Sequence, residues 1–185
     1  MAEPLLGKLL VATPALLDPN FARTVVLICD ENEHGKLGII LNRPFRVEVA
    51  TYAPEWGPLA SPPARVFEGG PVAREGALAV GRLRDETPPA AGWIPITDTL
   101  GIVDLDASPA DFWGDLVGLR VFSGYAGWGA GQLEDEIAEQ AWFVLDSAPA
   151  DPFDPEPTDL WEQVLRRQGG DFSTFAPGPG DPASN

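Results

Sequence analysis

The hydrophobic positions of this chain fall mostly in short unbroken runs, and the clearest run is residues 24–29. This run is rich in β-branched residues and does not alternate with polar ones, so it predicts a strand that is buried on both faces. A second run at residues 38–41 predicts its antiparallel neighbour. The polar residues 30–36 between the two runs predict the hairpin loop that connects them.

Other apolar runs, bounded by Gly, Pro or polar residues, predict further short strands. They lie at residues 5–11, 66–68, 77–80, 93–96, 101–104, 119–122 and 142–145. A tight turn is expected at residues 69–72, where Gly-Gly-Pro follows a strand. Most of the regular structure should therefore be β-strand.

Helices are predicted at fewer places, and residues 159–168 give the clearest signal. Two Arg in the last turn and Gly169 directly after it mark the end of an amphipathic helix. The side chains expected on its inner face are Leu160, Trp161, Val164 and Leu165. A shorter helix is expected at residues 108–117, with Ser108 as its N-cap, and weaker signals lie at residues 47–59 and 132–141.

The stretch at residues 122–136 is unlike the rest of the chain. Four glycines lie within eight residues, at positions 124, 127, 129 and 131, and Tyr125 and Trp128 stand among them. The pattern predicts a strand, a glycine loop and a helix that begins at Gln132. The glycine spacing does not match a phosphate-binding loop, and the three carboxylates that follow would repel a phosphate. The aromatic residues either form a contact surface or cover the core.

Composition changes the picture mainly through charge. The chain has 185 residues and a formal net charge of -16, and residues 121–165 contain no Lys or Arg. These features argue against direct binding to nucleic acid, since the phosphate backbone would be repelled. The length suits one domain, expected at residues 1–175, with a flexible tail at 176–185. No signal peptide or membrane span is recognised, so we expect a cytoplasmic protein that does not bind membranes.

Residues that could carry chemistry are few. Cys29 is the only cysteine, and the two carboxylates that follow it would raise its pKa, so a small buried hydrophobe is expected, with redox sensing as the alternative. His34 is the only histidine and lies in the hairpin loop, and Ser123 is not in a nucleophile elbow. The acidic residues beside His34 indicate a solvated loop rather than a cation site. We expect no catalytic residue, metal or cofactor.

Arg23 and Arg43 attract attention because each lies at one end of the paired strands in a chain poor in basic residues. Either guanidinium can bind the carboxylate of a ligand. A partner within the protein, such as Asp18 or Glu68, is the simpler expectation.

Several segments together resemble one bacterial family, the YqgE/AlgH family, also called UPF0301 or DUF179. They are LLVATP at residues 9–14, DPNF at 18–21, RTVV at 23–26, GIILNRP at 38–44, GGPV at 69–72, GYAGW at 124–128, GQLE at 131–134, and Trp142. The resemblance implies an α+β domain in which a bifurcated, mostly antiparallel sheet folds into a pseudo-barrel with flanking helices. It implies no established enzymatic activity, and one branch is described as a transcriptional regulator without an evident DNA-binding motif.

Two functional interpretations follow. The first is a non-catalytic regulatory or interaction module that contacts an unknown protein partner through residues 124–132 and the turns at 42–44 and 69–71; a monomer is one of the oligomeric states compatible with it. The second is a small-molecule binder or enzyme with a polar pocket. The residues proposed to bind under one or the other interpretation are Arg23, Asn42, Arg43, Gly70, Tyr125, Gly127, Trp128 and Gln132.

Overall fold

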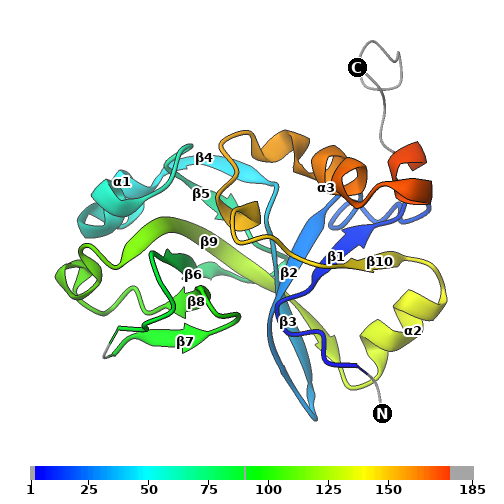
Figure 1. The fold of residues 1–185 in the computed structure, drawn as a ribbon, viewed down its shortest axis with the longest axis horizontal. Coiled ribbons are helices and arrows are strands. Elements are labelled where there is room, and N and C mark those ends of the chain that lie inside the picture. Colours follow the sequence, from blue (N-terminus) through cyan, green and yellow to red (C-terminus); the bar gives the residue numbers. More distant parts are fainter. Residues whose placement is uncertain (1–2, 90, 176–185) are drawn as a thin grey trace.

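The computed structural model describes residues 3–89 and 91–175, and Figure 1 shows how its strands and helices are arranged. The strands are β1 (Leu9–Ala12), β2 (Val25–Asn32), β3 (Gly35–Ile40), β4 (Pro44–Glu48), β5 (Arg65–Glu68), β6 (Val72–Leu83), β7 (Trp93–Pro95), β8 (Leu100–Val103), β9 (Leu116–Gly129) and β10 (Trp142–Leu145). The α-helices are α1 (Val49–Tyr52), α2 (Gln132–Ala138) and α3 (Leu160–Gln168). Short 3₁₀ helices are η1 (Pro54–Leu59), η2 (Pro109–Phe112), η3 (Asp151–Phe153), η4 (Pro157–Asp159) and η5 (Gly170–Phe175). The predicted tail at residues 176–185 lies outside the described residues.

The strands form one curled sheet in the order β10-β1-β2-β3-β9-β6-β8-β7, in which neighbours are antiparallel. β5 joins β9 in parallel and β4 pairs with β5. The curled sheet makes a half-barrel, and helices pack outside it (Figure 1). The fold class implied by the family resemblance is therefore confirmed.

β9 is the strand at which the sheet divides. β6 runs along one edge of β9, whereas two different strands share the other edge. β5 pairs with residues 121–123 of β9, and β3 pairs with residues 126–129. Gly69 joins the two, because its N–H donates to the Ser123 carbonyl and its own carbonyl accepts from the Ile40 N–H, each at 2.8 Å. We call this place, where the ends of β3 and β5 meet residues 123–126, the fork.

Glycine is required where backbones cross at the fork. Gly124 has a φ of +74°, and a Cβ there would overlap the carbonyl oxygen of Gly70. A Cβ at Gly70 would in turn overlap the carbonyl of Tyr125. The prediction of a glycine loop at residues 123–131 is therefore wrong: β9 continues to Gly129, because β6 pairs with Ser123 and Tyr125 and β3 pairs with residues 126–129.

β2 explains the unbroken apolar run near the N-terminus. Its odd-numbered residues, such as Leu27 and Cys29, face the core under α3, and its even-numbered residues, such as Val26 and Ile28, face the core under α2. Successive side chains of a strand point to opposite faces, so a strand between two cores has no polar face. The predicted burial of this strand on both faces is confirmed.

Two local predictions need correction for reasons of hydrogen bonding. The hairpin after β2 is tighter than expected, because Asn32 pairs with Gly35 and only Glu33 and His34 remain in the turn. Ser108 makes no side-chain cap, and the predicted helix at 108–117 is reduced to the 3₁₀ helix η2. The weak helix at 47–59 is divided into α1 and η1.

α3 has the predicted inner face, since Leu160, Trp161, Val164 and Leu165 are all buried. The Trp161 indole donates to the Ala12 carbonyl at 2.9 Å, which fixes the helix to β1. Gly169 ends the helix with a φ of +71°. Within the described residues, no helix has the length and apolar character needed to cross a membrane.

Candidate ligand-binding pocket

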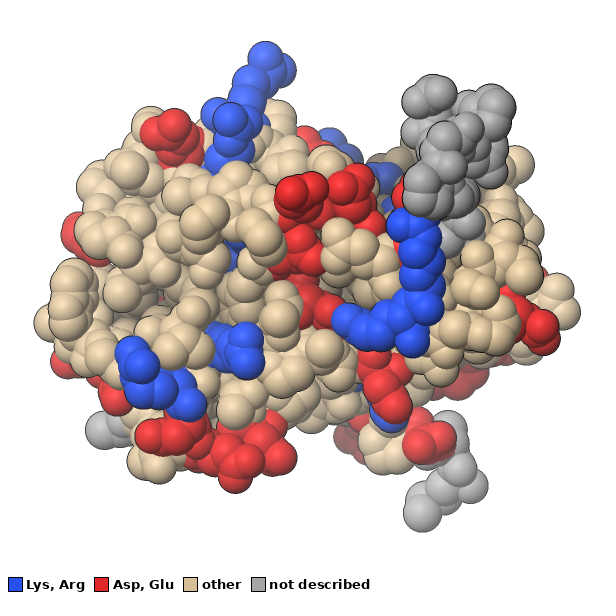
Figure 2. Space-filling model, turned by 45° about the horizontal axis from the view of Figure 1, so that its top comes forward, with Lys and Arg blue, Asp and Glu red and all other residues tan. Residues whose placement is uncertain are grey.

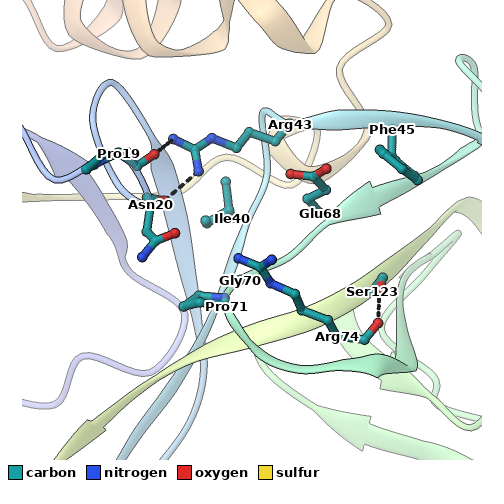
Figure 3. Close-up of a pocket in the computed structure, with 10 residues that line it drawn as sticks. All are labelled: Pro19, Asn20, Ile40, Arg43, Phe45, Glu68, Gly70, Pro71, Arg74 and Ser123. Carbon is teal, nitrogen blue, oxygen red and sulfur yellow. Dashed lines mark hydrogen bonds between the residues drawn. The ribbon is translucent and has the colours of Figure 1, made fainter.

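A pocket of about 440 Å³ opens at the fork, and we call it the fork pocket (Figure 3). This volume falls in the range of small-molecule sites, which is roughly 300–1,000 Å³. Its lining comes from segments far apart in sequence. The lining residues are Pro19, Asn20, Ile40, Arg43, Phe45, Glu68, Gly70, Pro71, Arg74 and Ser123.

Arg43 follows the end of β3 and crosses to the turn at residues 18–22. Its Nη1 donates to the Asn20 carbonyl at 2.5 Å, and its Nη2 donates to the carbonyls of Pro19 at 2.9 Å and Ala22 at 3.4 Å. Burial lowers the pKa of Arg43, while the negative charges of Glu68 and Asp18 act in the opposite sense. An arginine side chain stays positively charged in proteins, so Arg43 contributes a cation to the lining of the fork pocket.

Arg74 reaches the pocket from an irregular part of β6. Val72 pairs with Tyr125 and Ala77 pairs with Ser123, so residues 73–76 of β6 stand opposite one residue of β9. Ala73 has a φ of +51°, an unfavourable value for a residue with a side chain. The Ser123 hydroxyl donates to the Arg74 carbonyl and holds this bulge in place. Bulges commonly redirect a side chain, and Figure 3 shows the Arg74 guanidinium directed back over the pocket.

The charged groups in the pocket are not all paired within the protein. Across residues 3–89 and 91–175, no hydrogen bond or ion pair engages the side chain of Arg74 or of Glu68. Glu68 ends β5, and its backbone N–H donates to the Arg43 carbonyl at 2.8 Å. In Figure 3 its carboxylate is drawn beside the Arg43 side chain, to the right of both guanidinium groups. The fork pocket is therefore lined by an exposed cation and an exposed anion that form no hydrogen bond or ion pair through their side chains in the described residues.

Part of the remaining wall of the pocket is apolar. The ring of Phe45 is 38% exposed although β4 lies against β5, and Ile40 and Pro71 contribute further apolar surface. An apolar wall with a few convergent polar groups is typical of sites for small ligands.

A second cavity, of about 480 Å³, lies beside η3 and α3. Its Arg167 forms a bidentate ion pair with the buried Asp151, at 2.7 and 2.9 Å. That pair raises the pKa of Arg167, the main cause being the hydrogen bond. This arginine is bound within the protein, in contrast to Arg74 at the fork.

Of the residues proposed from sequence, only Arg43 and Gly70 line the fork pocket. Arg23 instead pairs with Glu162 at 3.1 Å and lies 4.4 Å from the centre of the Trp161 ring. Both arginines thus have the internal partners that were expected, but these are Glu162 for Arg23 and backbone carbonyls for Arg43 instead of Asp18 or Glu68. Asn42 joins two strands, since its Oδ1 accepts from the Val25 N–H at 3.0 Å and its Nδ2 donates to the Arg23 carbonyl at 2.9 Å.

The glycine and aromatic residues near the end of β9 lie away from the fork pocket. Trp128 is only 5% exposed and packs against Trp142, so the expectation that it supplies contact area is wrong. Gln132 accepts from the Gly129 N–H and donates to Glu136, each at 3.1 Å. Tyr125 is partly exposed, beside Gly127, on a shallow groove next to the β2–β3 hairpin. The binding role proposed for Tyr125, Gly127 and Gln132 stays a prediction.

Cys29 is 2% exposed, which confirms that its thiol is inaccessible. Burial, and secondarily the charge of Asp30, raises the pKa of this thiol. Since the thiolate is the reactive form, the structure does not favour a redox role for Cys29.

Arg74, Phe45 and the binding role of Glu68 were missed from the sequence. No periodicity marks them, because Arg74 lies in a bulge and Glu68 ends its strand. The available signal was the charged residues at positions 74 and 75, just before the apolar run at 77–80.

Positive and negative side chains are intermixed on the face of the molecule that Figure 2 shows. On the face shown in Figure 2, the Lys and Arg side chains lie among Asp and Glu side chains and form no continuous basic patch. A mixed surface of this kind lacks the footprint of a nucleic-acid interface on that face.

Comparison with known proteins gives a consistent result. Residues 9–173 match the family described as AlgH-like (DUF179). A UPF0301 protein of Streptomyces coelicolor is 49% identical over 98% of this chain and 95% of its own length, and one of Mycobacterium ulcerans is 42% identical over 97% and 90%. A crystal structure of a protein from Corynebacterium diphtheriae is 31% identical, with a TM-score of 0.91 over 96% of this chain and 94% of that one. The solution structure of AlgH from Pseudomonas aeruginosa is 28% identical, with a TM-score of 0.69 over 96% and 98%.

Proposed function

The chain belongs to the AlgH-like family, and we propose that this member is a non-catalytic binding module that acts in the cytoplasm. It holds a small ligand in the fork pocket through an anionic group of that ligand. Its regulatory effect would follow from the bound ligand and from a protein partner, without direct contact to nucleic acid. The observation that carries the proposal is the Arg74 guanidinium, which a strained bulge holds over a concave site and which forms no side-chain hydrogen bond or ion pair within residues 3–89 and 91–175.

Binding rather than catalysis is supported by the chemistry of the lining. General acid–base or nucleophilic catalysis needs a positioned nucleophile, with a base within hydrogen-bond reach. In the fork pocket the Ser123 hydroxyl already donates to a backbone carbonyl. The chain's only histidine, His34, lies at the β2–β3 turn and does not line this pocket. Arg74, Arg43 and Glu68 remain, and these are groups that bind charge.

An anionic group suits this site because Arg74 and Arg43 can act on it together. Arg43 uses three hydrogen bonds to hold the turn at 18–22, which leaves two of the five N–H donors of a guanidinium for a ligand. In the part of the chain that the structure describes, no side-chain donor of Arg74 is used. Hydrogen bonds between a guanidinium and a carboxylate or phosphate are short and charge-assisted, and they are about twice as strong as neutral ones.

The proposal is tested by titrating the ¹⁵N-labelled protein with acetate and, separately, inorganic phosphate while recording amide chemical shifts. We expect saturable shifts at residues 68–74 for at least one anion. Arg74→Gln should weaken that binding about tenfold, the loss of one charge-assisted hydrogen bond. Arg65→Gln is the matched control, because Arg65 is an exposed arginine of β5 outside the pocket lining. Equal binding by Arg74→Gln and wild type, or no saturable binding of either anion, would overturn the proposal.

A further inference from the structure

Arg74 and Glu68 present opposite charges to the same cavity, and this narrows the class of ligand. A ligand with negative charge alone, such as a polyphosphate, would satisfy Arg74 but would leave Glu68 facing its own charge. A ligand with positive charge alone would leave Arg74 and Arg43 unsatisfied. Like charges brought together in a partly closed site disfavour binding, so the ligand that fits best carries both signs.

We propose that the fork pocket binds a zwitterion of the α-amino acid type with an apolar side chain, its carboxylate on Arg74 and its ammonium group on Glu68. This inference rests on the proposed function, because it names the ligand class of the same site. Both charged side chains line one cavity of about 440 Å³, so a single small molecule can reach the two of them.

The apolar side of the pocket supplies the third point of recognition. Phe45, Ile40 and Pro71 line the cavity together with the charged groups. Phe45 is exposed although it is large and apolar, so a ligand side chain that covers its ring would gain from removing apolar surface from water. The volume of about 440 Å³ accommodates one amino acid and excludes a folded polypeptide.

Glu68 and Arg74 are held on different strands, so their side chains are separate in the absence of a ligand. Glu68 ends β5, and Arg74 leaves β6 at its bulge, so each side chain is fixed to a separate strand paired with β9. No ion pair closes between them in the described structure, although both are in the same cavity. A binding site of this kind does not need to break an internal ion pair when it takes up a zwitterion.

The test compares three probes with the full-length protein: phenylalanine, N-acetylphenylalanine, which lacks the ammonium group, and phenylalaninamide, which lacks the carboxylate. Amide chemical shifts at residues 68–74 report binding. We expect each blocked form to bind about tenfold more weakly than phenylalanine, the factor for one charge-assisted hydrogen bond. In Glu68→Gln the preference for phenylalanine over its N-acetyl form should fall to less than about twofold by the same reasoning.

The control variant is Glu48→Gln, which removes an exposed carboxylate of β4 outside the pocket lining and should retain the wild-type preference. If Glu68→Gln is not folded by circular dichroism, Glu68→Ala serves in its place. Equal binding of phenylalanine and N-acetylphenylalanine overturns the zwitterion while leaving anion binding intact. A preference that survives in the Glu68 variant also overturns it. If none of the three probes binds, the inference fails, and the acetate and phosphate titrations show separately whether the proposed function stands.

Discussion

The end of β9 and the fork pocket both contain polar groups beside aromatic rings, but they differ in how those groups are used. At the end of β9, the Glu136 carboxylate accepts from the indoles of Trp128 at 3.2 Å and Trp142 at 3.1 Å. Gln132 of α2 accepts from the Gly129 N–H of β9 at 3.1 Å. At the fork, the charged ends of Arg74 and Glu68 have no partner in the described structure. In the first region the polar groups find their hydrogen-bond partners within the protein, which we call the complete region. In the second, the incomplete region, the charged groups do not.

This difference shows why the sequence analysis placed the binding surface at the glycine and aromatic residues near the end of β9 and not at the fork pocket. Glycines and aromatic residues are prominent in sequence, yet here they solve a packing problem between β9, β3 and α2. Charged side chains that line one cavity without a hydrogen bond or ion pair in the described residues are the better sign here, although Arg74 and Glu68 are themselves exposed. That property becomes visible only when the partners of each side chain are known.

The largest expected effect comes from the region that is complete. Trp128→Ala should lower the free energy of unfolding by about 3–5 kcal/mol, because it removes a buried indole that packs between Phe21 and Trp142. Trp113→Ala is the control, since Trp113 is 63% exposed and its loss should cost less than about 1 kcal/mol. Urea denaturation measures both. A Trp128→Ala protein as stable as wild type would mean that this aromatic cluster is not part of the core.

Alanine at two glycines with positive φ should have a smaller effect on stability. Comparing the two variants distinguishes the cost of close backbone approach at the fork from the cost of backbone strain. Gly124 and Gly131 both have positive φ, at +74° and +78°. Gly131→Ala should cost about 1–2 kcal/mol, because nothing lies within 4 Å of the added Cβ and only the strain remains. Gly124→Ala should cost a further 1–3 kcal/mol or so, because its Cβ overlaps the Gly70 carbonyl. Equal thermal midpoints for the two variants would argue against the crossing of backbones described here.

The smallest effect on stability is expected within the incomplete region. Arg74→Gln should change the free energy of unfolding by less than about 0.5 kcal/mol, because its side chain holds nothing else in place. Arg43→Gln should cost about 1–3 kcal/mol, because the turn at 18–22 loses hydrogen bonds to a charged group. Guanidinium denaturation of the two variants compares them directly. Similar losses in both would show that Arg74 has a structural partner.

Much of the fold was predictable because local patterns determine it. The unbroken run in β2 indicated a strand between two cores, and the four inner positions of α3 followed from helical periodicity alone. The extension of β9 through its glycines could not be predicted in this way. It depends on β3 and on the crossing at Gly70, which supply partners from distant parts of the sequence.

The candidate site was predictable only at its most constrained positions. Arg43 and Gly70 were singled out because they belong to turns with distinctive sequences, and both line the fork pocket. Arg74 and Glu68 were not, since their importance arises from a bulge and a strand end that meet only in three dimensions. No spacing along the chain encodes that meeting.

The contact between Trp128 and Trp142 also gives the protein an intrinsic spectroscopic signal. Their ring centres are 6.1 Å apart and their planes make an angle of 81°, so the excited states of the two indoles couple with a fixed handedness. Because one carboxylate from α2 holds both rings, a shift of that helix alters the coupling before the strands separate. Circular dichroism in the indole absorption bands therefore reports how α2 is seated, without a label and under native conditions.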